Sequence, residues 1–261
     1  HHLNIENYST PTKKKFLIDY FFPLHRSYTD YASEFCDTNF IFSMGLKSSL
    51  VEIVDRDRRD QILYISNWSE KEDGVNFYQC PKSKKFYTRD QFFRLERTFL
   101  QFVEMYCISR RIDLVVLGRM NCDELREREF FCDIFATQHP QYIFPSDIFD
   151  LYREVDRSSI VVGVDSTMLY ESLARGAKVA LFPFRGLDLN TYAKSFLWPK
   201  DLPDEGFFWS ERDDPTSWHE VLDRVRSASK KEFSEHLSIL GSEFCGANLV
   251  TELNRLIRFD G

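Results

Sequence analysis

Strand-length apolar runs alternate with segments of helical periodicity along most of this 261-residue sequence. Residues 112–118 (IDLVVLG), 158–164 (SSIVVGV) and 178–184 (KVALFPF) are nearly continuous apolar runs, and residues 61–66 (QILYIS) form a shorter one. Strands that are buried on both faces have this composition. Because such strands alternate here with helices, the pattern predicts a parallel sheet covered by helices on both faces. We therefore expect an α/β, Rossmann-like fold.

The segments between these runs carry the spacing and the end signals of helices. Apolar side chains recur at helical spacing over residues 88–110. Residues 122–138 have acidic residues in the first turn, where the helix dipole favours them. Ser146 is a good N-cap for residues 146–155, and Gly176 is a typical stop for residues 167–176. We also expect a short strand at 141–144 and helices at about 215–228, 230–240 and 246–258.

A charge run at residues 55–60 (DRDRRD) separates the regular pattern from the chain before it. It contains no apolar residue, which is typical of a linker or a solvated turn. We therefore predict an N-terminal segment over residues 1–60 and one α/β domain over residues 61–261. Residues 13–22 and 39–44 are candidate strands of the N-terminal segment.

Bulk composition argues against several classes of protein. The net charge of −7 and the pI of about 5.5 disfavour a general nucleic-acid binder, which usually has a basic excess. No apolar run reaches the roughly 18 residues that a transmembrane helix needs. The six cysteines show neither a C-x-x-C pair nor a zinc-type spacing, so we expect reduced thiols and a cytoplasmic location. The start does not resemble a signal peptide, and His1-His2 resembles the remnant of an expression tag.

Sheets of this type bind ligands beyond the carboxyl ends of their strands. That rule points to three loops, over residues 66–85, 118–122 and 163–167. We expect these loops to lie at one edge of the sheet.

The turn Asp165-Ser166-Thr167 joins the end of an apolar run to the start of a helix. The free N–H groups of a helix N-terminus bind anions, and the two hydroxyls add donors. The turn therefore predicts a phosphate site, although Ser166 or Thr167 could equally serve only as a helix cap. Glu171 lies about one turn further on and could accept a hydrogen bond from a ribose hydroxyl, or could simply be solvated.

Arg119 and Arg185 each follow an apolar run directly, which places them at the same predicted edge. A guanidinium suits a phosphate or a carboxylate because it is always charged and donates in a fork. Two arginines that converge on Ser166 and Thr167 would suit a diphosphate, or a monophosphate together with a sugar carboxylate. The alternative for Arg119 is an ion pair with Asp123 or Glu124.

Glu72, Asp73 and His139 are weaker candidates for general acid or base chemistry. The two carboxylates lie in a charged loop, where a solvated turn is the simpler interpretation, and His139 could be a helix C-cap. The sequence has no Walker motif, no G-x-G-x-x-G, no G-x-S-x-G and no H-E-x-x-H. D-x-D occurs only as DRD in the linker, so we expect no metal ion.

Residues 161–186 (VVGVDSTMLYESLARGAKVALFPFRG), with FLWP at 196–199 and GFFW at 206–209, resemble surface-carbohydrate (O-antigen) biosynthesis proteins. Those proteins in turn resemble the Kdo and sialic-acid transferases of capsule and lipopolysaccharide synthesis. The resemblance implies the C-terminal, donor-binding half of a GT-B glycosyltransferase over residues 61–258. It further implies that Ser166 and Thr167 hold the donor phosphate, that Glu171 holds the ribose and that Arg119 stands in the donor-side loop.

The same resemblance implies transfer of a sugar from a nucleotide-sugar donor, with a CMP-linked ulosonic acid as the first choice, to a growing surface glycan. The implied partners are the nucleotide-sugar and a glycan or lipid-linked glycan acceptor, with no further cofactor and with a peripheral place at the inner membrane. Bacterial sialyltransferases also carry an acidic-acidic-Gly motif and a His-Pro motif, which match Glu72-Asp73-Gly74 and His139-Pro140 here.

One feature departs from the GT-B pattern, in which two Rossmann-like domains face each other. Residues 1–60 are too few for the first domain, so we expect a remnant or a part of an acceptor-side domain there. The alternative function is a non-catalytic α/β module that binds a nucleotide or a partner protein in an envelope-polysaccharide system. A nucleotide-sugar epimerase or a phosphotransferase on a related fold is a third possibility.

Overall fold

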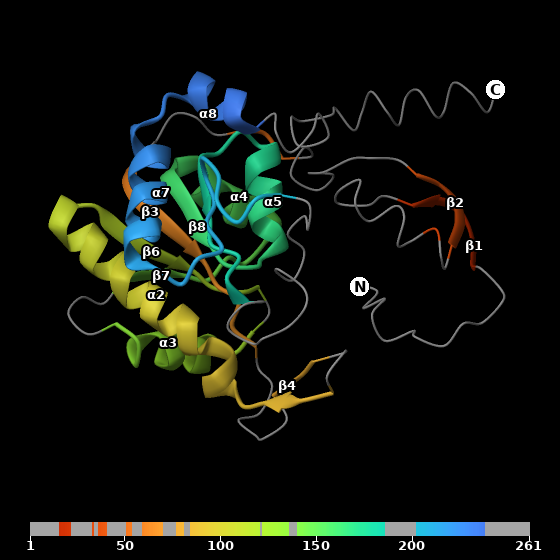
Figure 1. Cartoon of the computed structure of the whole chain (residues 1–261), viewed down its shortest axis with the longest axis horizontal. Helices are drawn as coiled ribbons and strands as arrows, with labels where there is room; N and C mark the ends of the chain where they lie inside the picture. Colours follow the sequence, from red (N-terminus) through yellow and green to blue (C-terminus); the bar gives the residue numbers. More distant parts are fainter. Residues whose placement is uncertain are drawn as a thin grey trace.

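A five-stranded sheet organises the part of the chain that the structure describes (Figure 1). The computed structural model describes residues 16–21, 33, 36–40, 51–53, 59–69, 77–80, 84–120, 122–135, 140–185 and 202–237. The strands are β3 (Arg59–Ile65), β6 (Asp113–Leu117), β7 (Gln141–Ile143), β8 (Ser158–Gly163) and β9 (Val179–Leu181). Their order is β7-β6-β3-β8-β9, and every pairing is parallel. The predicted parallel α/β sheet is confirmed.

Helices cover both faces of this sheet (Figure 1). The helices are α2 (Arg89–Arg110), α3 (Glu124–Cys132), α4 (Ile148–Arg157), α5 (Thr167–Ala174), α7 (Pro215–Ser227) and α8 (Lys230–Leu237). The chain moves outward from β3 to β6 and β7 and then returns to β8 on the other side of β3. Because crossovers between parallel strands are right-handed, this reversal puts α2 and α3 on one face and α4 and α5 on the other.

Four aromatic side chains fill the space between α2, α7 and the end of β9. The ring of Phe99 lies 4.5 Å from that of Phe182, 5.6 Å from that of Phe184 and 5.3 Å from that of Trp218. All four side chains are fully buried. Aromatic pairs at these separations stabilise a fold beyond the area that they bury. The apolar runs predicted as strands therefore also supply the core between sheet and helices.

The helix ends follow local side-chain chemistry. At the start of α2, Thr88 and Gln91 form a capping box, with N···O distances of 3.2 and 3.0 Å. The cap of α4 is Asp147, which accepts from the N–H of Asp150 at 2.8 Å, and not the expected Ser146. Ser146 instead donates its hydroxyl to the Asp150 carboxylate, so the helix begins one residue later than predicted.

Other predicted bounds agree in part. The helix expected over 122–138 ends as α3 at Cys132, and residues 136–139 lie outside the described residues. The helices expected at 215–228 and 230–240 are α7 and α8, whereas 246–258 lies outside the described residues. The loop expected over residues 66–85 is wrong in detail, because it contains β4 (Tyr78–Gln79), which pairs with β5 (Phe86–Tyr87) directly after the loop as an antiparallel hairpin.

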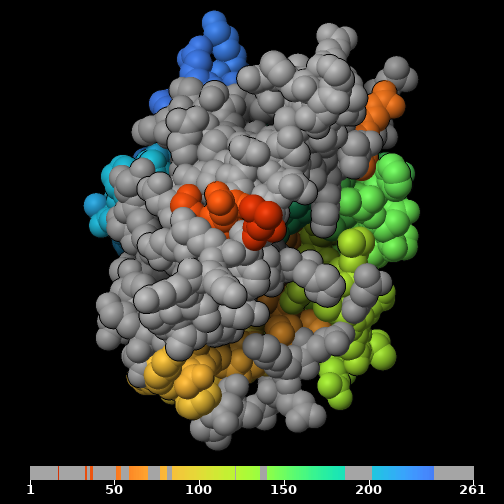
Figure 2. Space-filling view, turned by 90° about the vertical axis from the view of Figure 1, so that its right-hand side faces the viewer, coloured from red at the N-terminus to blue at the C-terminus, as the bar shows by residue number. Residues whose placement is uncertain are grey.

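The N-terminal segment contributes a separate two-stranded sheet. Its strands β1 (Phe16–Phe21) and β2 (Cys36–Phe40) are parallel and confirm that strands occur in this segment. Leu17 of β1 is 85% exposed, and Figure 2 shows the described residues of both strands, coloured red to orange, at the surface. The strand β3 begins inside the charge run at residues 55–60, while the division into two domains there stays a prediction.

Among the described residues, no helix combines the length and the apolar character that crossing a membrane requires.

We expect Phe99→Ala to lower the free energy of unfolding by about 3–5 kcal/mol, because it leaves a cavity among aromatic rings that cannot fully collapse. The matched control is Phe149→Ala, since Phe149 is 55% exposed and its loss should change stability by less than about 0.5 kcal/mol. Urea unfolding of both purified variants measures the difference. Equal losses would contradict the described core.

Candidate functional site

The strand order reverses between β3 and β8, so the switch point of the sheet lies at the carboxyl ends of these two strands. Doubly wound sheets bind their ligands at such a switch point. The side-chain amide of Asn67, just after β3, donates to the carboxylate of Asp165, just after β8. Arg119, just after β6, donates from Nη1 to the carbonyl of Trp68 at 2.8 Å. The prediction that the three loops share one edge is confirmed.

The turn at the start of α5 caps the helix, and some of its hydrogen-bond donors have no partner among the described residues. Ser166 is the N-cap and accepts from the N–H of Met168 at 3.3 Å. Thr167 is the first residue of the helix, so its N–H has no intrahelical acceptor. Among the described residues, the Thr167 hydroxyl has no hydrogen-bond partner either, and the side chain is half-buried. The capping interpretation holds for Ser166, while phosphate binding by the turn stays a prediction.

Asp165 holds this turn through its hydrogen bonds. Its carboxylate accepts from the Asn67 amide and from Nε of Arg185 at 2.6 Å, and the side chain is only 8% exposed. The positive charge of Arg185 therefore offsets the negative charge next to the proposed phosphate position. Asp165 therefore connects the turn to Asn67 and to Arg185.

Arg185 lies in a different environment from the one expected. Its guanidinium is 1% exposed and donates to Asp165, to the carbonyl of Phe92 at 2.7 Å and to the carboxylate of Glu96. It also lies over the Phe92 ring, 4.1 Å from the ring centre. Burial lowers its pKa, but the Asp165 and Glu96 carboxylates outweigh burial and raise it, so the group stays charged. Arg185 is therefore part of an internal ion pair, and it reaches the turn only through its contact with Asp165.

Glu96 links this ion pair to the sheet, and the sequence did not single it out. It is fully buried on α2 and accepts a hydrogen bond from the hydroxyl of Tyr64 on β3. Burial raises the pKa of Glu96, although the Arg185 charge and both hydrogen bonds oppose that shift. A signal was present, since Glu96 occupies the core-facing spacing that Phe92 and Phe99 define on the same helix.

Glu171 is half-buried and accepts from the hydroxyl of Tyr152 on α4. Burial and this bond raise the pKa of Tyr152, so the phenol stays protonated. The guanidinium of Arg175 lies 4.8 Å from the Tyr152 ring centre and donates to the carbonyl of Val51 at 2.9 Å. Glu171, the predicted ribose-binding residue, is therefore held by Tyr152 of α4, and Arg175 beside that tyrosine contacts Val51.

Arg119 differs from Arg185 because its side chain is exposed. Its backbone N–H donates to Glu127 at 3.1 Å, and its Nη1 reaches the Trp68 carbonyl. Asp123, the alternative partner, accepts from the N–H of Arg126 as the N-cap of α3 and forms an ion pair with the same arginine at 3.5 Å. The indole N–H of Trp68 is buried and has no acceptor among the described residues.

Glu72, Asp73 and His139 lie outside the described residues and stay predictions. Within the described ranges, no three His, Cys, Asp or Glu residues gather as a metal ion would require.

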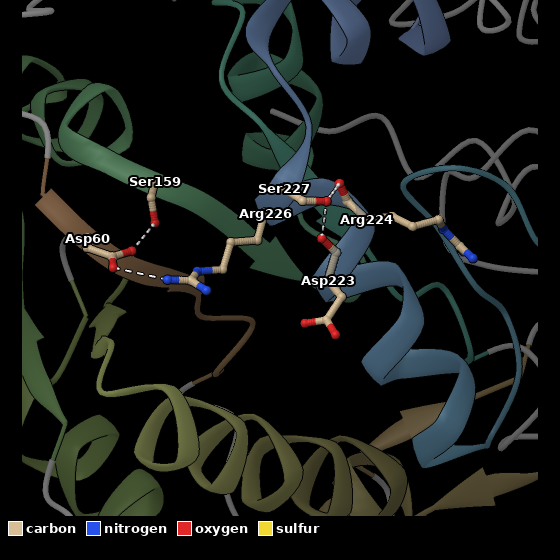
Figure 3. A pocket seen from close by; sticks show the side chains of 6 residues that line it. All are labelled: Asp60, Ser159, Asp223, Arg224, Arg226 and Ser227. Carbon is tan, nitrogen blue, oxygen red and sulfur yellow. Dashed lines mark hydrogen bonds and ion pairs between the residues drawn. The ribbon is translucent and has the colours of Figure 1, made fainter.

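A surface hollow of about 580 Å³ lies elsewhere (Figure 3). Asp60 and Ser159 lie near the starts of β3 and β8, so the hollow opens at the amino edge of the sheet, opposite the predicted site. Arg226 bridges it by pairing with Asp60 at 3.2 Å. Its lining residues are Asp60, Ser159, Asp223, Arg224, Arg226 and Ser227. Since its opposite charges are paired and the switch point is distant, the hollow is not the predicted site.

The profile of a protein family described as "putative O-antigen biosynthesis protein" matches residues 4–243. The chain belongs to this family. The resemblance to O-antigen biosynthesis proteins is thereby confirmed, and the match runs across the charge run at residues 55–60. Among curated proteins, none matches the chain significantly.

Two solved structures of the wall teichoic acid polymerase TagF, one soaked with CDPG, are 16% identical to the chain, with TM-scores of 0.46 and 0.45. Each match covers 93% of this chain and 57% or 58% of TagF, so the chain spans less than two thirds of that protein. A crystal structure from Listeria monocytogenes, provisionally assigned as a UDP-N-acetylglucosamine 2-epimerase, is 11% identical with a TM-score of 0.36, covering 71% of this chain and 46% of that one. Likenesses at these TM-scores do not establish a common function.

We expect Arg185→Met to lower the free energy of unfolding by about 3–5 kcal/mol, because it leaves the Asp165 and Glu96 carboxylates buried without their cation. Arg119→Met is the matched control and should cost less than about 1 kcal/mol, since that side chain is exposed. Denaturant unfolding of the two variants measures both values. A stable Arg185→Met protein would refute the anchoring role.

Proposed function

We propose that this chain is the donor-binding part of a glycosyltransferase of O-antigen assembly. The observation that carries the proposal is the helix N-terminus of α5, placed at the switch point of a parallel sheet with unused donors. The family supports a role in surface-glycan synthesis, and a glycosyltransferase of that process needs a site for the phosphate of a nucleotide-sugar.

In this proposal the donor phosphate sits against the start of α5. The Thr167 N–H and the hydroxyls of Ser166 and Thr167 donate to its oxygens, and the helix dipole favours its charge. Glu171 accepts from a ribose hydroxyl. As the bond between sugar and phosphate breaks, negative charge grows on the phosphate, so these fixed donors stabilise the transition state more than the ground state.

The donor we favour is a CMP-linked ulosonic acid. Such a donor carries one phosphate and one sugar carboxylate. With Arg185 committed to Asp165 and Glu96, Arg119 is the exposed arginine of the two predicted, and one exposed guanidinium suits one carboxylate beside the phosphate at the turn. In the sequence, two converging arginines suited either a diphosphate or a monophosphate together with a sugar carboxylate, so a diphosphate donor stays the alternative.

The remaining parts of the reaction are proposals of the same kind. The acceptor is a growing or lipid-linked glycan at the cytoplasmic face of the inner membrane, and no metal ion is required. Glu72, Asp73 and His139 are the proposed acid and base groups. Much of the acceptor side belongs to the N-terminal segment, residues 1–60.

Nucleotide binding is tested by thermal unfolding with CMP, CDP, UDP and GDP. A nucleotide that binds only the native state stabilises it by mass action, by about 2.7 kcal/mol at a hundredfold excess over its Kd. We expect CMP to raise the melting temperature most. No rise with any of the four at millimolar concentration would overturn the proposed donor site.

The double variant Ser166→Ala/Thr167→Ala should lose this stabilisation by CMP while keeping the fold. Loss of the cap itself costs about 1 kcal/mol. Asp214→Ala is a matched control, because Asp214 caps α7 in the same way, accepting from the N–H groups of Thr216 and Ser217, and its loss should leave CMP binding unchanged.

Intact CMP binding in the double variant would show that the turn serves only as a helix cap. Binding without turnover, in an assay of the full-length protein with donor and acceptor, would support the non-catalytic module instead.

A further inference from the structure

We propose that Glu127 is a positioning residue that holds Arg119 in place for its ligand. The inference rests on the proposed function, in which Arg119 binds the anionic group of the donor. Glu127 belongs to α3 and is fully buried, so it acts through Arg119 and does not touch the ligand itself.

The Glu127 carboxylate joins the ends of two neighbouring strands. It accepts from the hydroxyl of Ser66, directly after β3, and from the backbone N–H of Arg119, two residues after β6. Among the described residues, no cation forms a salt bridge with it. Burial raises its pKa, while the bonds from Ser66 and Arg119 oppose that shift.

These contacts close a ring around Arg119. The Ser66 hydroxyl that donates to Glu127 also accepts from the N–H of Trp68 at 3.1 Å. The carbonyl of Trp68 then accepts from Nη1 of Arg119 at 2.8 Å. Glu127 therefore holds the Arg119 backbone directly and its guanidinium through Ser66 and Trp68.

The turn before Arg119 is packed closely against Phe144 and Glu127. A Cβ on Gly118 would overlap the Phe144 ring and would lie 3.3 Å from Oε2 of Glu127. A buried carboxylate at this helix position costs more than an apolar side chain unless it is fully hydrogen-bonded. Glu127 accepts hydrogen bonds from two residues at the carboxyl edge of the sheet, which explains why a carboxylate is present here.

A guanidinium that is exposed but already oriented loses less conformational entropy when it binds an anion. The ring through Glu127 supplies that orientation. Without it, Arg119 keeps its charge and loses its fixed direction, so affinity falls although the ligand contact remains possible.

The test combines hydrogen exchange with a double-mutant cycle on the affinity for CMP-N-acetylneuraminic acid, a CMP-linked ulosonic acid that carries the carboxylate proposed for Arg119. In Glu127→Ala we expect the Arg119 amide to exchange at least tenfold faster while the amides of β6 keep their protection. Affinity for this donor should fall about as much as in Arg119→Ala, and the double variant should be no weaker, because one residue acts through the other. Glu127→Gln keeps a carbonyl acceptor and should restore both readouts to within about threefold of wild type.

Glu129→Ala is the matched control, since Glu129 lies on the exposed side of α3 and should change neither readout. If Glu127→Ala does not fold, Ser66→Ala tests the other branch of the ring: the Arg119 amide stays protected by Glu127 while the affinity for CMP-N-acetylneuraminic acid falls. Unchanged affinity in Ser66→Ala would then overturn the inference.

Unchanged exchange of the Arg119 amide in Glu127→Ala, or additive losses in the cycle, overturns the positioning role. Failure of the wild-type protein to bind CMP or any other nucleotide overturns the proposed function instead. The exchange experiment needs no nucleotide, so the two failures are distinguishable.

Discussion

The ion pairs of Arg185 with Asp165 and Glu96 are the interaction on which the carboxyl edge of the sheet depends. They tie α2, the end of β9 and the turn before α5 into one unit, with the Tyr64 hydroxyl as a further bond into the sheet. Two carboxylates thus share one guanidinium that is almost fully buried. Burial raises the pKa of Glu96, and the positive charge of Arg185 together with the hydrogen bonds from Tyr64 and Arg185 opposes that shift.

This arrangement limits the groups that a ligand at the carboxyl edge of the sheet could contact. Asp165 accepts hydrogen bonds from Arg185 and Asn67, and Glu171 accepts one from the Tyr152 hydroxyl. The hydrogen-bond donors that stay available near the α5 N-terminus are those of the turn itself and of Arg119. A nucleotide-sugar with one phosphate and one carboxylate, as we propose, would match these donors.

Sequence periodicity predicted the parallel sheet and the loops at its edge, because buried strands and amphipathic helices leave a pattern that does not depend on distant partners. It could not predict β4 and β5, since strands of two residues have no periodicity to detect. Nor did it reveal Glu96 or Glu127, because a glutamate on a helix suggests a solvated side chain. Their core-facing spacing, with Phe99 and with Phe130 and Phe131, was the available signal, and only the fold shows that each meets donors from the sheet edge.

The two predicted arginines show why an edge position alone does not define a ligand site. Both follow a strand, and both lie at the predicted edge. Arg185 follows Phe182 and Phe184, which are buried against α2 and α7, so the arginine side chain is buried as well. Its positive charge there needs the nearby carboxylates as partners. Arg119 follows Gly118, whose missing side chain lets Phe144 close over the turn and leaves the next side chain in solvent. Topology sets which residues are neighbours, and the packing of the preceding residue then decides whether a charge supports the fold or is available to a ligand.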